Sequence, residues 1–104
     1  MSLPNKSEFQ CIDHGRFKVT GDITFSSAAS VWEQARKVLL SLEEDRLDID
    51  IGSAREMDSG GLALLVAWSR WAYCNKKVLT FSNASDTARK LIVNNKLQDL
   101  LKLT

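Results

Sequence analysis

The amino-acid sequence predicts an α/β fold: a small mixed β-sheet of about four strands, with about three to four helices packed on it, in the order β-β-α-β-α-β-α. Two observations predict this class. An early pair of apolar runs flanks a Gly-containing turn, as in a hairpin, and later segments alternate between strand and helix periodicity. A strand–helix–strand succession implies a right-handed crossover between neighbouring parallel strands. The early hairpin therefore adds an antiparallel edge to a parallel sheet.

Length and composition indicate a single soluble domain. The chain has 104 residues, of which 44% are hydrophobic and 26% charged. We expect the domain to span residues 9–104, preceded by a loose leader over residues 1–8 that contains the only proline. The net charge of +1 argues against nucleic acid or an anionic membrane as a partner. The sequence shows neither a signal peptide nor a bilayer-spanning run, so we expect a cytoplasmic protein without direct membrane insertion.

The first half of the chain contains the hairpin and an amphipathic helix. Phe9–Ile12 and Phe17–Thr20 are predicted strands, joined by an Asp-His-Gly-Arg turn. Ser26 and Ser27 are candidate N-caps for the helix that follows. Apolar residues recur at helical spacing as far as about Glu43, with charges between them, which predicts a helix with one buried face.

The second half alternates between strands and helices. Arg46–Ile51 alternates strictly between apolar and polar residues, which predicts a half-buried strand. A helix over Ser59–Cys74, a strand over Lys77–Phe81 and a helix over Thr87–Val93 are predicted to follow. A last apolar patch must dock on the body of the domain and consists of Leu97, Leu100, Leu101 and Leu103.

Few side chains offer catalytic or metal-binding chemistry. Cys11 and Cys74 lie far apart without a neighbouring histidine, and we expect them to be reduced, packed thiols. The only histidine, His14, falls in the predicted turn, and no nucleophile can be paired with it. We therefore expect no metal, no cofactor and no enzymatic activity.

The segment Met57-Asp58-Ser59-Gly60-Gly61 introduces the most apolar helix. A helix start exposes backbone N–H groups and carries partial positive charge, and either Asp58 or Ser59 can cap it. Each glycine in a helix is unfavourable by about 1 kcal/mol relative to alanine. Two of them in one turn indicate either a tight turn or the close approach of another group to the backbone. The Gly-rich motifs that bind phosphate are absent.

The body of this helix is apolar on nearly all sides. Between Gly61 and Cys74, only Ser69, Arg70 and Tyr73 carry polar side-chain atoms besides the indoles. Such a helix is either deeply buried or partly covered by another chain. Both arrangements remain open here: a helix sandwiched between the sheet and other helices, and a helix whose N-terminal part contacts a partner.

The order of elements, with the Asp-Ser-Gly-Gly-Leu segment after an alternating strand, resembles the STAS domain family (sulfate transporter and anti-sigma factor antagonist). The resemblance covers about residues 9–103 and includes the Gly-Asp-Ile-Thr loop at 21–24. It implies the STAS fold. Anti-sigma factor antagonists carry Asp-Ser-Ser-Gly-Leu-Gly, or the same with threonine third, and their first serine is phosphorylated by a partner kinase. Ser59 matches that serine, whereas Gly60 and Ala63 depart from the motif.

A second branch of the family fits the segment better. The STAS subunit of Mla-type ABC transporters, which move phospholipid between the membranes of Gram-negative bacteria, has a motif similar to Asp-Thr-Gly-Gly-Leu-Ala-Leu-Leu. Asp58–Leu65 differs from it only by serine in place of threonine, and the Trp-Glu pair in the first helix is also similar.

The resemblance implies a non-catalytic cytoplasmic adaptor that binds the transporter's ATPase subunit and is held at the inner membrane through that complex. The alternative is an anti-sigma factor antagonist with Ser59 as the candidate phosphoacceptor. Thr24 stands where the family often has an acid. Small-molecule binding, as in some other STAS domains, leaves no motif in the sequence. The candidate partner-binding residues are Asp22, Thr24, Met57, Asp58, Ser59, Gly60, Gly61 and Ala63.

Overall fold

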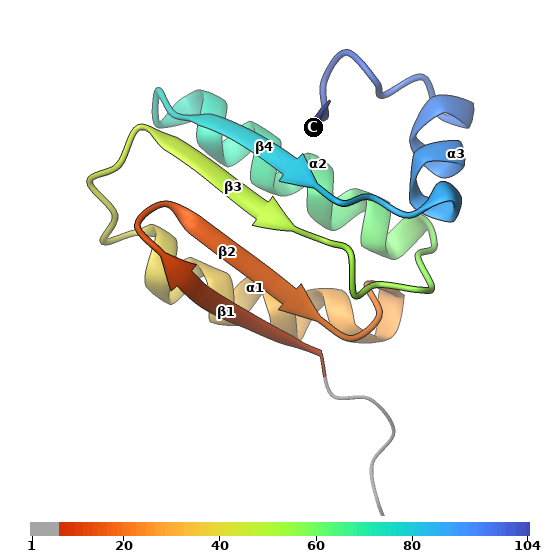
Figure 1. Cartoon of the computed structure of the whole chain (residues 1–104), viewed down its shortest axis with the longest axis horizontal. Coiled ribbons are helices and arrows are strands. Elements are labelled where there is room, and N and C mark those ends of the chain that lie inside the picture. Colours follow the sequence, from red (N-terminus) through yellow and green to blue (C-terminus); the bar gives the residue numbers. More distant parts are fainter. Residues whose placement is uncertain (1–6) are drawn as a thin grey trace, which may run out of the picture.

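The computed structural model describes residues 7–104 and confirms the predicted α/β fold, with one strand more than expected. Helices α1 (Phe25–Leu39) and α2 (Ser59–Cys74) lie behind the sheet in Figure 1, and α3 (Asp86–Asn94) lies beside one end of it. The elements are β1 (Glu8–Asp13), β2 (Arg16–Thr20), α1 (Phe25–Leu39), β3 (Arg46–Asp50), α2 (Ser59–Cys74), β4 (Val78–Ser82), α3 (Asp86–Asn94) and β5 (Lys102–Leu103).

The strands form one sheet in the order β1-β2-β3-β4-β5. β1 and β2 make the antiparallel hairpin, and the three remaining pairings are parallel. Phe17 pairs with Ile49, and Ile49 with Phe81, so apolar side chains line the face toward the helices. Their polar neighbours face the other side, where Thr80 and Ser82 both donate to the Asp48 carboxylate, at 2.8 and 2.7 Å.

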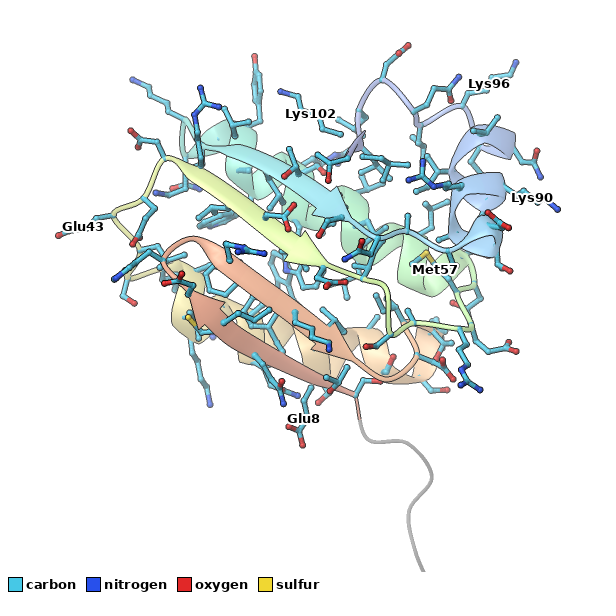
Figure 2. The ribbon with its side chains drawn as sticks, viewed as in Figure 1. Glu8, Glu43, Met57, Lys90, Lys96 and Lys102 are labelled. Atoms are coloured by element: carbon cyan, nitrogen blue, oxygen red, sulfur yellow. The ribbon has the colours of Figure 1, made fainter. Side chains whose placement is uncertain are left out.

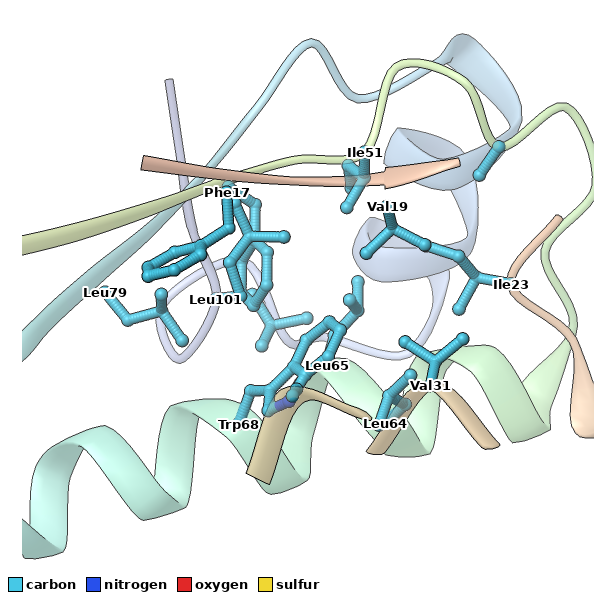
Figure 3. Packing of buried hydrophobic residues seen from close by; sticks show 14 of the residues in the cluster. Phe17, Val19, Ile23, Val31, Ile51, Leu64, Leu65, Trp68, Leu79 and Leu101 are labelled. Atoms are coloured by element: carbon cyan, nitrogen blue, oxygen red, sulfur yellow. The ribbon is translucent and has the colours of Figure 1, made fainter. Parts of the chain in front are cut away.

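The core lies between the apolar face of the sheet and helices α1 and α2. Trp68 of α2 is fully buried at its centre, with ring centroids 5.8 Å from Phe9 and 6.3 Å from Phe81. Figure 3 shows Trp68 and Leu65 directed from α2 toward Phe17 of the sheet. This burial holds α2 in place and fixes the position of its N-terminal end.

Helix α1 differs from the prediction at both ends. It begins at Phe25 with Thr24 as N-cap, and Ser27 instead accepts a hydrogen bond on Oγ from the Thr24 N–H at 3.0 Å. The predicted N-caps Ser26 and Ser27 therefore lie inside the first turn. The helix ends at Leu39, and just after it the N–H groups of Ser41 and Leu42 donate to carbonyl oxygens three residues earlier, as in a turn. Farther along, Lys77 Nζ donates to the carbonyl oxygen of Glu44 at 2.6 Å.

The C-terminal apolar patch docks as predicted and also adds a strand. Leu101 is fully buried, and Leu97 and Leu103 pack against the core, while Leu100 stays 42% exposed. Lys102–Leu103 pairs with β4 as β5. Two residues are too few to show alternation, which is why this strand could not be predicted.

The outer edge of β1 is partly covered by a side chain of α1. Gln34 Oε1 accepts from the Phe9 N–H at 3.0 Å, and Gln34 Nε2 donates to the Ser7 carbonyl oxygen at 3.3 Å. Ser7 is buried, and its hydroxyl donates to the Asp22 carbonyl oxygen at 2.6 Å. Ser7 and Glu8 thus belong to the fold, although we expected them in the leader. The rest of that leader lies outside the described residues.

Candidate functional site

Two loops that are distant in sequence meet at the N-terminal end of α2. One connects β2 to α1 over residues 21–24, and the other connects β3 to α2 over residues 51–58. Ile23 and Met57 form a parallel β-bridge, and the Ile23 N–H donates to the Glu56 carbonyl oxygen at 3.1 Å. Figure 2 shows Met57 at this end of the molecule. The loops therefore form one continuous surface.

Two carboxylates join the loops reciprocally. Asp22 Oδ1, on the first loop, accepts from the backbone N–H groups of Arg55 and Glu56, at 3.1 Å each. Asp58, on the second loop, accepts from the Phe25 N–H, at 2.9 Å to Oδ1. Each acid thus binds the backbone of the opposite loop, and the start of α1 is fixed relative to the start of α2.

Asp58, not Ser59, is the N-cap of α2. Its Oδ1 accepts from the Gly61 N–H at 3.0 Å. Hydrogen bonds from Gly61 and then from Phe25 lower the pKa of Asp58 below its ordinary value of 3.8. The carboxylate is therefore negatively charged at neutral pH, and it lies where the partial positive charge of the helix favours an anion.

The two glycines of α2 are required by the chain's own packing. A Cβ on Gly61 would lie 2.0 Å from the Ile23 carbonyl oxygen, and a Cβ on Gly60 would lie 2.4 Å from the Phe25 Cα. Of the two explanations that the sequence left open, the structure shows the close approach of another group, and that group is the chain's own β2–α1 loop with the start of α1. The two glycines permit the close approach of the two loops.

The predicted site residues divide into a buried support and an exposed surface. Met57 is 9% exposed and Gly61 is buried, while Gly60, Asp22 and Thr24 are partly buried. The exposed members are Asp58, Ser59 and Ala63. Ser59 and Ala63 are four residues apart and so share one face of α2.

The structure adds Phe25, which the sequence analysis did not place in the site. Its side chain is 81% exposed, although its backbone touches α2 beside Gly60. We call Phe25, Asp58, Ser59 and Ala63 together the α2 platform. The only sequence signal for Phe25 was an apolar residue just before the Ser-Ser pair, and placing the helix cap at those serines hid it.

Most of the apolar surface of α2 is covered by the domain itself. Leu62, Leu64, Leu65, Trp68 and Ala72 are buried against the sheet and neighbouring elements. The sandwiched arrangement therefore accounts for the helix body. The exposed residues of α2 are Ser59 and Ala63 in the platform, Arg70, and Tyr73 and Cys74 at the opposite end.

The remaining candidate chemistry is sparse. Cys11 and Cys74 are free and exposed, so the expectation of packed thiols is wrong; Cys11 lies within β1, and Cys74 is the last residue of α2. Within residues 7–104, no three His, Cys, Asp or Glu side chains gather as they would around a metal ion. Across the same residues, every helix is too short or too polar to cross a membrane.

Comparison with known proteins agrees with this architecture. The sequence profile of a family described as Mlab, STAS domain, matches residues 12–102. The chain therefore belongs to the STAS domain family, as the resemblance implied.

Solved structures share the fold at low sequence identity. A putative anti-sigma factor antagonist from Thermotoga maritima superposes with a TM-score of 0.77 at 9% identity, over 91% of this chain and 82% of that one. The anti-sigma factor antagonist SpoIIAA, in its unphosphorylated form, superposes with a TM-score of 0.69 at 13% sequence identity, over 94% of this chain and 86% of that one. SLC26A9 superposes with a TM-score of 0.63 at 15% sequence identity, over 82% of this chain but only 16% of that protein.

Proposed function

We propose that this protein is a non-catalytic adaptor that binds the ATPase subunit of an Mla-type ABC transporter for phospholipid. It would act in the cytoplasm, held at the inner membrane through the complex, and support the assembly or activity of the ATPase. The observation that carries the proposal is the α2 platform: exposed small residues at a helix end whose backbone is fixed from two sides. The similarity of Asp58–Leu65 to the transporter-subunit motif supports this choice of partner.

In this proposal the site residues have two kinds of role. Ser59 and Ala63 contact the partner directly, and their small side chains allow it to approach the helix closely. Asp58 orients the helix end and presents a negative charge. The remaining candidates shape the platform from below through the loop contacts described above: Asp22, Thr24, Met57, Gly60 and Gly61.

Replacing Ser59 with arginine tests the site. We expect Ser59→Arg to weaken binding to the purified ATPase subunit by at least about tenfold, because a long charged side chain keeps the two surfaces apart. The fold should be retained, since Ser59 is exposed. Binding is measured by co-purification and titration. Cys74→Arg, at the exposed opposite end of the same helix, is the matched control and should bind like the wild type. Unchanged binding of Ser59→Arg would show that the site is elsewhere.

A phosphorylation-switched anti-sigma factor antagonist is the second candidate function. The observation that favours it is the exposure of Ser59 at the first position of α2. A phosphate there adds about −1.5 to −2 charge, which a helix N-terminus favours and the neighbouring Asp58 carboxylate opposes.

This candidate predicts that an anti-sigma kinase with ATP adds the mass of one phosphoryl group to the wild type and not to Ser59→Ala. Mass spectrometry measures the product. Phosphorylation without any binding to the ATPase would favour the antagonist over the adaptor. An unmodified wild-type chain would exclude this switch for the kinase used.

A further inference from the structure

One large apolar side chain of the platform, that of Phe25, is largely exposed to solvent. Phe25 is 81% exposed, more than any other large side chain made only of hydrocarbon among residues 7–104; the next is Leu40 at 66%. Single exposed apolar residues are common on protein surfaces. Exposure alone therefore does not distinguish Phe25; the contacts of its backbone do.

The backbone of Phe25 is held firmly against the N-terminal end of α2, although its side chain is exposed. Both oxygens of Asp58 lie within hydrogen-bond distance of the Phe25 N–H, at 2.9 and 3.1 Å. Gly60 provides the space in which the Phe25 Cα rests on α2. Two residues of the motif thus serve to hold a residue whose side chain contacts little of its own domain.

This arrangement is typical of a binding anchor. Aromatic side chains dominate the energetics of protein interfaces, and an anchor fixed before binding loses little conformational entropy when the complex forms. The exposed residues of the first turns of α2, Ser59 and Ala63, are small, so a partner that binds the Phe25 ring can also approach this helix end.

We propose that Phe25 is the hydrophobic anchor of the α2 platform and inserts into an apolar pocket of the partner protein. This inference rests on the proposed adaptor function and names the chemistry of its interface. Such a pocket is apolar, and a basic side chain at its rim would complement the exposed, negatively charged Asp58 carboxylate, which the Phe25 and Gly61 N–H groups hold in place. An exposed aromatic ring and a charge at one helix end fit such a pocket, and they do not fit a flat polar surface.

The test compares two exposed aromatic residues of the same domain. Phe25→Ala is expected to weaken binding to the purified ATPase subunit by at least about tenfold, and Phe25→Leu should recover part of that loss. Tyr73→Ala is the matched control, because Tyr73 is 85% exposed at the far end of α2, and it should leave the Kd unchanged. Circular dichroism and thermal unfolding should show that all variants are folded.

A second measurement does not depend on affinity. A photo-reactive benzophenone side chain placed at position 25 should crosslink to the ATPase subunit, and the same group at position 73 should not. If Ser59→Arg abolishes binding while Phe25→Ala leaves it unchanged and position 25 gives no crosslink, the anchor is wrong and the adaptor function stands. If the wild-type chain does not bind the ATPase subunit at all, both proposals are wrong.

Discussion

Gly61→Ala is expected to destabilise the domain strongly, by about 2–3 kcal/mol or more. The new Cβ would lie 2.0 Å from the Ile23 carbonyl oxygen, which is backbone and cannot move aside like a flexible side chain. Either the β2–α1 loop must separate from α2, or the helix start must shift and break the Asp58 cap. Urea unfolding at neutral pH, with a comparison of m-values, measures the loss.

Whether Gly61→Ala lowers or raises the free energy of unfolding shows which matters more at this position, tertiary packing or helix propensity. In an ordinary helix, alanine in place of glycine stabilises by about 1 kcal/mol. The control is Ala63→Gly on the exposed face of the same helix, which should cost about that amount through propensity alone. A Gly61→Ala variant as stable as the wild type, or more stable, would show that the loop does not require this glycine.

Asp58→Asn is expected to lower the Tm at neutral pH and to reduce binding at the platform. Asparagine can still cap a helix, but it lacks the charge and the second equivalent acceptor that the carboxylate offers to Phe25. The start of α1 should therefore loosen relative to α2. Thermal unfolding gives the Tm, and amide hydrogen exchange at Phe25 and Gly61 locates the change.

The effect of Asp58→Asn on the Tm is expected to depend on pH. Hydrogen bonds from Gly61 and Phe25 lower the pKa of Asp58 in the folded state below 3.8. The stability that this group contributes is present above its unfolded-state pKa and is lost as the pH falls through the folded-state pKa. The Tm difference between wild type and Asp58→Asn should thus be constant near neutral pH and shrink below about pH 4.

Local patterns in the sequence were sufficient to predict most of the secondary structure. The strict alternation of Arg46–Ile51 predicted β3, and helical periodicity placed α2 at Ser59–Cys74, the bounds found in the structure. The errors lie where a distant residue decides the outcome. The segment after α1 accepts hydrogen bonds from Lys77, more than 30 residues later, and β5 exists only through its pairing with β4.

The candidate site shows the same division between local and distant causes. The motif around Asp58 marked the right helix end, because capping depends on a few adjacent residues. The motif alone could not show why positions 60 and 61 must be glycine. The loop that packs against them lies more than 30 residues earlier in the chain. For the same reason Phe25 was overlooked: its exposure follows from the docking of two loops.

The pairing made by Gln34 has a consequence for the way this domain meets other proteins. An open strand edge recruits extended segments through main-chain hydrogen bonds. At the start of β1, the Phe9 N–H and the Ser7 carbonyl oxygen are already held by an amide that takes the place of another strand. The opposite border of the sheet offers only the two residues of β5. The start of β1 therefore has fewer free main-chain groups for an added strand than an uncovered edge would have, and the edge beyond β4 is occupied where β5 pairs with Thr80 and Phe81.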